Sequence, residues 1–97
     1  MITRIFRVQI NPELRASFEK DFQEISVPLI ESHNGLAWVS VGKPTQWAPD
    51  EYVMISRWNS AGDLDRVVGK RWDQPLIPPG MEKYVVECWV HHFEDFS

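Results

Sequence analysis

The sequence predicts an α+β fold in which two helices cover one face of a four-stranded antiparallel sheet. The first observation is the length, because 97 residues fit one ordinary globular domain and leave no room for a second. The second is that strand-like and helix-like hydrophobic patterns follow each other in the order strand, helix, strand, strand, helix, strand. This split β-α-β-β-α-β order is typical of the ferredoxin-like layout. We therefore expect residues 1–97 to form a single domain.

The first two elements are a strand and an amphipathic helix. Residues 2–10 nearly alternate and are rich in β-branched and aromatic side chains, which favours a strand. Asn11 suits an N-cap and Pro12 suits the first helical position, so we expect the helix to begin at Pro12. Pro28 lacks an amide hydrogen and predicts a kink or break before a final turn ending near Ser32. The helical spacing gives one apolar stripe, expected to pack on the sheet, of Leu14, Phe18, Phe22, Ile25 and Leu29.

The next two elements are expected to form a hairpin. The pair Asn34-Gly35 supplies the end of the preceding helix. Residues 36–41 and residues 51–58 both have strand-like patterns. The loop between them, residues 42–50, contains two prolines and Trp47. We expect the two strands to pair directly across this loop.

The last part of the chain predicts a short helix and a long strand. Ser60 and Asp63 resemble a capping box at the start of the helix, and Gly69 is expected to end it. An irregular, lid-like connection over residues 74–80 contains three prolines. Residues 84–93 then form the longest and clearest strand of the chain.

This final strand carries apolar residues on both of its faces. One set is Val86, Cys88 and Val90, and the other is Val85, Trp89 and Phe93. Two helices on one side of a sheet cover only one of these faces, so the other needs a different cover. The sheet of a second copy is the simplest cover, since each apolar side chain so buried contributes roughly 1.5–3 kcal/mol. The sequence therefore predicts a homodimer.

The composition excludes several classes of function. Ten Lys and Arg against fourteen Asp and Glu give a net charge of −4, so we expect no nucleic-acid partner. The apolar runs are far shorter than the ~20 residues of a membrane span, and no leader pattern is visible. We therefore expect a cytoplasmic protein with no membrane partner. Cys88 is the single cysteine, which excludes an internal disulfide and a cysteine metal cluster, and it is expected to be a core residue.

Three short segments resemble a known family. They are the turn Asn11-Pro12-Glu13, the helix exit His33-Asn34-Gly35, and the run from Ser56 to Ala61 that leaves the third strand. Within that run, Arg57-Trp58-Asn59-Ser60 is the most specific piece. Over residues 1–95 the chain resembles the antibiotic biosynthesis monooxygenase (ABM) superfamily of dimeric α+β barrel proteins. The resemblance implies a homodimer with face-to-face sheets and a small-molecule cavity between sheet and helices in each subunit.

The resemblance also bears on cofactors. Family members include cofactor-free oxygenases of aromatic polyketides and haem-degrading oxygenases. The tryptophan of the cofactor-free oxygenases corresponds to Trp58, while the asparagine four residues earlier is replaced here by Met54. The haem-degrading members hold iron with a histidine in or just after the second helix, and residues 64–70 contain none. We therefore expect no haem and no other cofactor.

The tryptophans are the main candidates for ligand contact. Five tryptophans in 97 residues are several times the usual frequency, and large aromatic side chains suit a flat hydrophobic ligand. Trp58 and Trp72 are the strongest substrate-binding candidates, since one lies near a strand end and the other beside the lid-like connection. Trp38 is a further candidate. The alternative is that these side chains fill the core and dimer interface of a small protein.

A few polar residues complete the candidate site. His33 could act as a general base towards a phenolic proton, or complement the negative end of the first helix. Tyr52 could donate a hydrogen bond to a ligand oxygen, or equally to the backbone or water. Arg57 alternates away from Trp58, which favours solvent or an acidic partner, and it would stabilise an oxyanion if it pointed inwards. His91 and His92 are adjacent on a strand and point to opposite faces, so they cannot chelate one metal. We expect no metal site.

These observations predict a cofactor-independent monooxygenase that acts on a small aromatic or quinol-type substrate. His33 and Trp58 are the predicted catalytic residues. The substrate-binding residues are predicted to be Trp38, Tyr52, Arg57, Trp58 and Trp72. The alternative is a non-catalytic small-molecule-binding or interaction protein on the same dimeric barrel.

Overall fold

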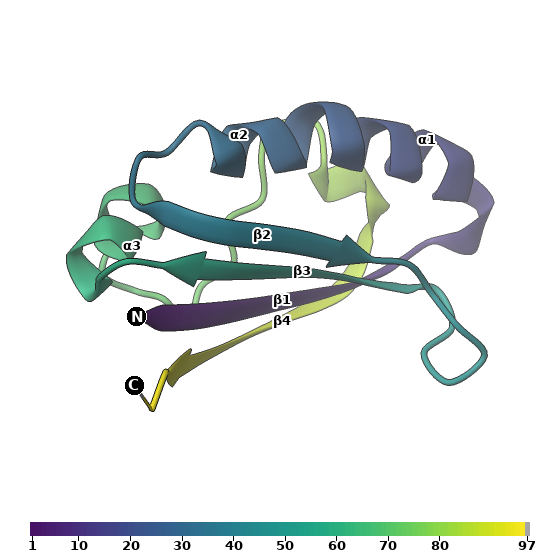
Figure 1. Ribbon diagram of the computed structural model, residues 1–97. Helices are drawn as coiled ribbons and strands as arrows, with labels where there is room; N and C mark the ends of the chain where they lie inside the picture. Colours follow the sequence, from purple (N-terminus) through teal and green to yellow (C-terminus); the bar gives the residue numbers. More distant parts are fainter. Residues whose placement is uncertain (97) are drawn as a thin grey trace.

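The computed structural model describes residues 1–96, and it contains one four-stranded antiparallel sheet with two helical segments packed against it (Figure 1). The strands are β1 (Ile2–Ile10), β2 (Leu36–Gly42), β3 (Glu51–Trp58) and β4 (Val85–Glu94), in the spatial order β2-β3-β1-β4. The helices are α1 (Arg15–Asp21), α2 (Val27–Glu31) and α3 (Ala61–Val68). Helices α1 and α2 lie over the sheet, and α3 lies at one of its ends (Figure 1). The predicted ferredoxin-like α+β fold is confirmed.

The first helical segment is continuous, with a π-helical turn in its middle. It begins with a 3-10 turn at Pro12–Leu14, where the Asn11 Oδ1 atom accepts a hydrogen bond from the Glu13 amide at 3.1 Å. The π turn, Phe22–Ser26, separates α1 from α2. It lies directly before Pro28, whose ring nitrogen has no hydrogen to donate to a carbonyl in the preceding turn. The interruption predicted at Pro28 is therefore a π turn, and the helix continues beyond it to Glu31.

The π turn also changes which residues face the sheet. Phe18 and Phe22 are buried as predicted, whereas Ile25 and Leu29 are 38% and 37% exposed. The expectation that Ile25 packs on the sheet was wrong, because a π turn adds one residue and shifts the inward positions, whereas Leu29 still borders the space between helix and sheet. Ser26 is buried instead, and Ile30 packs against the core.

A bulge in β4 produces a second correction. Gln9 of β1 pairs with Glu87, but Ile10 pairs with Val85, so Val86 has no partner on β1. Val86 is 62% exposed, although the alternation predicted that it shares the face of Cys88. The bulge reverses that alternation, so that Val85 packs against the core on the same side as Cys88.

The predicted caps of α3 are confirmed. The Ser60 Oγ atom accepts a hydrogen bond from the Asp63 amide at 3.1 Å, and Gly69 ends the helix with a φ of 78°. The start of α3 packs closely on the turn before β2, since a Cβ atom on Gly35 would lie 2.2 Å from the Asp63 Cβ atom. Within residues 1–96, no helix is long and apolar enough to cross a membrane.

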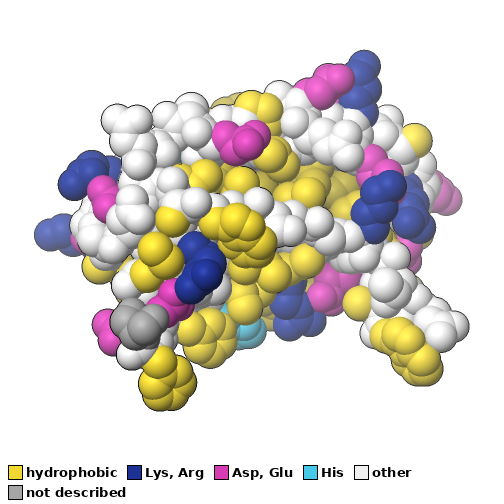
Figure 2. Space-filling view, viewed as in Figure 1, with side chains coloured by type: hydrophobic (Ala, Val, Ile, Leu, Met, Phe, Trp, Pro, Cys, Tyr) yellow, Lys and Arg dark blue, Asp and Glu magenta, His cyan; other side chains and the backbone are white. Residues whose placement is uncertain are grey.

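The two faces of the sheet differ in how they are covered. The helix-facing side holds two connected clusters of buried residues, one centred on Val8, Phe18 and Tyr52 and the other on Trp58 and Leu64. By the pairing register, the opposite face carries Ile5, Val53, Ile55, Trp89, Trp38 and Phe93. No helix of the described chain covers that face, and Figure 2 shows hydrophobic side chains exposed along the sheet and below it.

Candidate functional site

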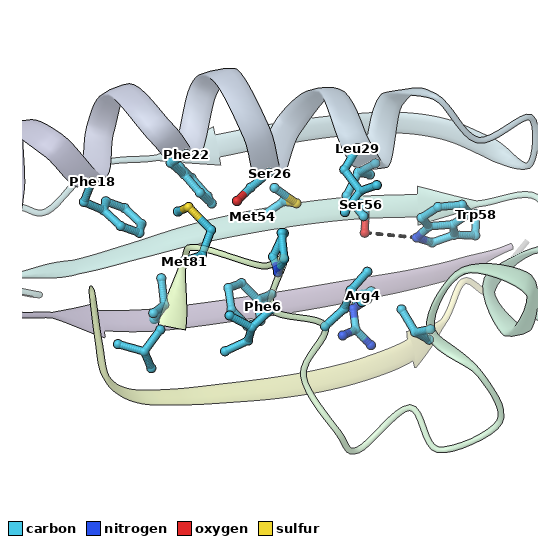
Figure 3. Close-up of a pocket in the computed structure, with 17 residues that line it drawn as sticks. Arg4, Phe6, Phe18, Phe22, Ser26, Leu29, Met54, Ser56, Trp58 and Met81 are labelled. Atoms are coloured by element: carbon cyan, nitrogen blue, oxygen red, sulfur yellow. Dashed lines mark hydrogen bonds between the residues drawn. The ribbon is translucent and has the colours of Figure 1, made fainter. Parts of the chain in front are cut away.

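An apolar cavity lies between the helices and the helix-facing side of the sheet (Figure 3). Strands β1 and β3 form its floor, and the first helical segment forms its roof. The connection between α3 and β4 closes a further side with Leu76, Ile77, Pro78 and Met81. Phe18 and Phe22 stack on each other on the roof, with ring centroids 5.0 Å apart. The cavity therefore offers aromatic and aliphatic contacts on most sides.

The cavity is small in this conformation. Its volume is about 50 Å³, whereas an apolar cavity that holds a benzene ring measures roughly 150 Å³. Residues 73–80, which contribute Leu76 to Pro78, are neither helix nor strand, so they are the wall that can move most easily. An aromatic ligand needs more room than this volume, and the lid-like role of the connection stays a prediction.

Trp58 forms one end of the cavity. Its side chain is fully buried, and the indole Nε1 atom donates a hydrogen bond to the Ser56 Oγ atom at 3.0 Å (Figure 3). Both residues lie on the helix-facing side of β3, two positions apart, so the strand itself sets their spacing. The hydrogen bond satisfies the indole N–H group and holds the ring in one orientation, in which it forms a wall of the cavity.

Arg4 is a buried charge that the sequence reading overlooked. It is 6% exposed and lines the cavity from the helix-facing side of β1. Its Nη1 atom donates to the carbonyl oxygen of Trp72 at 3.2 Å and lies 2.8 Å from the His92 Nε2 atom. Burial lowers the pKa of Arg4 to about 10, so the guanidinium is still charged at neutral pH. The alternation of β1 contained the signal, because it places Arg4 on the same face as Val8 and Ile10.

His92 is the acceptor in this contact. Arginine has no acceptor atom, so the His92 Nε2 atom must accept the hydrogen bond and carry no proton. Burial and the nearby charge of Arg4 lower the pKa of His92, which favours the neutral imidazole. The ring of Trp72 lies against that of His92, with centroids 5.1 Å apart. Arg4, Trp72 and His92 thus form one cluster beside the cavity, which we call the arginine cluster.

Two predicted residues lie at or near the cavity. Trp58 lines it, as described above. Trp72 is half-buried and borders a second, shallow hollow of about 120 Å³ with His92 and Phe93. Its indole Nε1 atom donates to the Asp65 Oδ1 atom at 2.7 Å, which ties the start of the connection to α3. Trp72 is therefore not a wall of the main cavity. It contacts His92, which contacts the cavity-lining Arg4.

Three predicted substrate-binding residues lie elsewhere. Trp38 is 49% exposed on the uncovered face of the sheet. Arg57 shares that face and forms an ion pair with Asp95. Tyr52 faces the helices, but its hydroxyl group donates to the Glu19 Oε2 atom at 2.5 Å. Burial, followed by this carboxylate, raises the pKa of Tyr52 to about 12.

His33 lies outside the cavity. It follows the end of α2, and its ring centroid is 6.4 Å from that of Trp58 in an edge-on arrangement. Trp58 lines the cavity and His33 does not, so His33 contacts the cavity wall from outside. Within residues 1–96, no three His, Cys, Asp or Glu side chains are grouped closely enough to hold a metal ion.

The chain belongs to the antibiotic biosynthesis monooxygenase family. The sequence pattern described as "ABM: Antibiotic biosynthesis monooxygenase" matches residues 1–70. The resemblance drawn from the sequence is therefore confirmed. Among curated proteins, none matches the chain significantly.

Several solved structures share the fold over nearly the whole chain. One described as an antibiotic biosynthesis monooxygenase gives a TM-score of 0.75 at 17% identity and covers 100% of both chains. SnoaB, a cofactor-independent oxygenase from Streptomyces nogalater, gives 0.73 at 14% identity, covering 99% of this chain and 93% of its own. A mutant of MhuD, solved with two manganese protoporphyrin IX molecules per active site, gives 0.71 at 14% identity, covering 100% and 96%. Identities this low show a common fold.

Proposed function

We propose that the chain binds a small aromatic molecule in the cavity beside Trp58 and oxidises it as a cofactor-independent monooxygenase. The observation that carries this proposal is the cavity, which has apolar and aromatic walls in a chain of the ABM family. Such walls suit a flat ring, and the connection over residues 73–80 gives it a way in. The proposed substrate is an electron-rich ring of the quinol type.

The chemistry needs little from the protein. Once such a ring has lost a phenolic proton, its anion can pass an electron to dioxygen without a metal or flavin. In the keto, anthrone-type tautomer of such a ring, the ring CH₂ group and O₂ give C=O and H₂O overall, so the substrate supplies all the electrons. The protein has to hold the ring, exclude bulk water and favour the deprotonated form.

The two predicted catalytic residues differ in their distance from the cavity, because Trp58 lines it and His33 does not. Trp58 is proposed as the wall against which the ring lies, since it is fixed by Ser56 and lines the cavity. His33 is proposed as the proton acceptor, and its place behind Trp58 requires a substrate that extends past that ring. Trp72 is proposed as a second aromatic contact once the connection has moved.

A second copy of this chain is the proposed partner. The uncovered sheet face presents Ile5, Ile55 and Trp89 between the more exposed Trp38 and Phe93. A flat apolar face of this kind is typical of a surface that packs on an identical sheet. A homodimer in the cytoplasm, with no nucleic-acid or membrane partner, is therefore part of this proposal.

The second candidate is a protein that binds the same class of molecule without changing it. One observation favours it: among the described cavity walls, Arg4 is the one residue with an ionisable side chain. A general base needs to lie within hydrogen-bond reach of the proton it removes. No wall residue can take that role.

Oxygen uptake distinguishes the two candidates. A panel of hydroquinones and anthrones is added to the purified protein in an oxygen electrode, and binding is followed in parallel by calorimetry. We expect uptake above the uncatalysed rate and a lower rate in Trp58→Phe. Trp47→Phe is the matched control, because Trp47 is 86% exposed on the loop between β2 and β3. Binding without uptake would establish the non-catalytic candidate, and the absence of any binding would contradict both.

A further inference from the structure

Arg4 is a buried guanidinium whose charge no carboxylate of the described chain balances. The ion pairs within residues 1–96 engage Arg7, Arg15, Lys43, Arg57, Arg66 and Arg71, and Arg4 is absent from them. Its partners are a backbone carbonyl and a neutral imidazole. Burying a charge without an opposite charge is costly. A charged group of this kind that lines a cavity is a candidate for contact with a ligand.

Two acidic residues that interact with members of the arginine cluster are already engaged. Asp65 accepts a hydrogen bond from the Trp72 indole at 2.7 Å, and Asp73 forms a two-point ion pair with Arg71. Neither carboxylate is within ion-pair distance of Arg4. Arg4, which lines the cavity, therefore has neither of these carboxylates as a partner.

One edge of the guanidinium remains available. Both hydrogen bonds of Arg4 use the Nη1 atom, so the Nε and Nη2 N–H groups make none within residues 1–96. In the same residues, no fully buried side-chain nitrogen or oxygen lacks a hydrogen-bond partner, so these two nitrogens must border accessible space. The N–H bonds of Nε and Nη2 are parallel, which matches the two oxygens of a carboxylate.

We propose that the cavity selects ligands that carry a carboxylate on an apolar, aromatic body, and that the free edge of Arg4 binds the carboxylate. The body would lie between Trp58, Phe6 and Met54, which line the cavity alongside Arg4 (Figure 3). This inference rests on the proposed function, since it names the class of molecule that the same cavity takes. Arg4 is then the residue that determines specificity.

The test compares two probes of the same shape. 2-Naphthoate and 2-naphthamide differ in charge and hardly in size, and their dissociation constants are measured at pH 7 by calorimetry. We expect naphthoate to bind about tenfold more tightly or better, as for a charge-assisted pair of hydrogen bonds. In Arg4→Met this preference should disappear while naphthamide binds as before. Arg15→Met is the control, because it removes the same charge from the surface of α1.

The results of this comparison separate the role of Arg4 from the binding of aromatic molecules. Equal affinities for the two probes in the unchanged protein, or a preference that survives Arg4→Met, would overturn the role of Arg4 and leave aromatic binding in place. Binding of neither probe would overturn the proposed function together with this inference. If Arg4→Met does not fold, Arg4→Lys serves instead, because it keeps the charge and loses the two-point geometry. It should weaken naphthoate binding severalfold, and an unchanged affinity would contradict the proposal.

Discussion

Arg4 and His92 are register partners on β1 and β4, and their side chains meet at 2.8 Å on the helix-facing side of the sheet. This contact is favourable because His92 is neutral, so its Nε2 atom can accept a hydrogen bond from the Arg4 guanidinium. Protonation of His92 would place two positive charges in contact in a partly buried position. The stability of the protein should therefore depend on the protonation of this histidine.

The first prediction concerns pH. The folded-state pKa of His92 is lowered from 6.5, so the unfolded chain binds this proton more readily than the folded one. Stability from this group is present above about pH 6.5 and is lost as pH falls below that value. The melting temperature should decrease between pH 7.5 and pH 5.5. His92→Gln, which keeps an acceptor, should flatten this dependence, whereas His91→Gln, which removes a smaller cause of the lowered His92 pKa, should change it much less.

The second prediction concerns the oligomeric state. The chain has a mass of 11.4 kDa, so a dimer sediments at twice that, about 23 kDa. An interface over the uncovered sheet face should bury well over ~1,000 Å² in total. Ile55→Asp places a charge in the middle of that face and should give monomers at micromolar concentration. Gln23→Asp adds the same charge at an exposed position of the first helical segment, and this variant should remain dimeric. A monomer in the unchanged protein would remove the proposed partner.

The amount of structure that the sequence predicted differs between elements. The bounds of β1 and β3 and the caps of α3 follow from alternation and local hydrogen bonding, and both signals lie within a few adjacent residues. Pro28 indicated an interruption of the helix, but local patterns predict neither its form as a π turn nor the bulge at Val86. Each inserts one residue, and each is selected by how the element packs as a whole.

The candidate site was predicted less completely for a related reason. Trp58 was found because it belongs to a recognisable short motif. Trp38 was placed with it, although the pairing register puts Trp38 on the opposite face, and the alternation that points Arg57 away from Trp58 gave its ion-paired position as the alternative. Arg4 was overlooked because arginine side chains are usually exposed. Its burial depends on β4 and on the connection between α3 and β4, which are distant in the sequence.

The third prediction concerns haem. The histidine that the haem-degrading oxygenases use as an iron ligand has no counterpart in α3, whose residues run from Ala61 to Val68 without a histidine. The purified chain should be colourless, and a haem titration should give no saturable Soret shift at one haem per subunit. A saturable shift that is lost in His33→Ala or His92→Ala would contradict this prediction and assign an iron ligand.

The fourth prediction concerns Trp72. It packs at the edge of the second core cluster and borders the shallow hollow, whereas Phe18 is 2% exposed in the middle of the first cluster. Phe18→Ala should cost about 3–5 kcal/mol of stability, as for other buried phenylalanines. Trp72→Ala should cost clearly less, because part of its ring already meets solvent. It should nevertheless weaken aromatic binding, since the variant loses the ring that packs on His92, the residue whose Nε2 atom contacts Arg4.

Two measurements check the role of Trp72. Thermal unfolding of Trp72→Ala should give a cooperative transition close to that of the unchanged protein, and an aromatic ligand should quench tryptophan fluorescence less than it does there. An unfolded Trp72→Ala would show that Trp72 is a structural residue. A normally folded variant with unchanged ligand affinity and quenching would separate Trp72 from the site and leave Trp58 as the aromatic wall of the cavity.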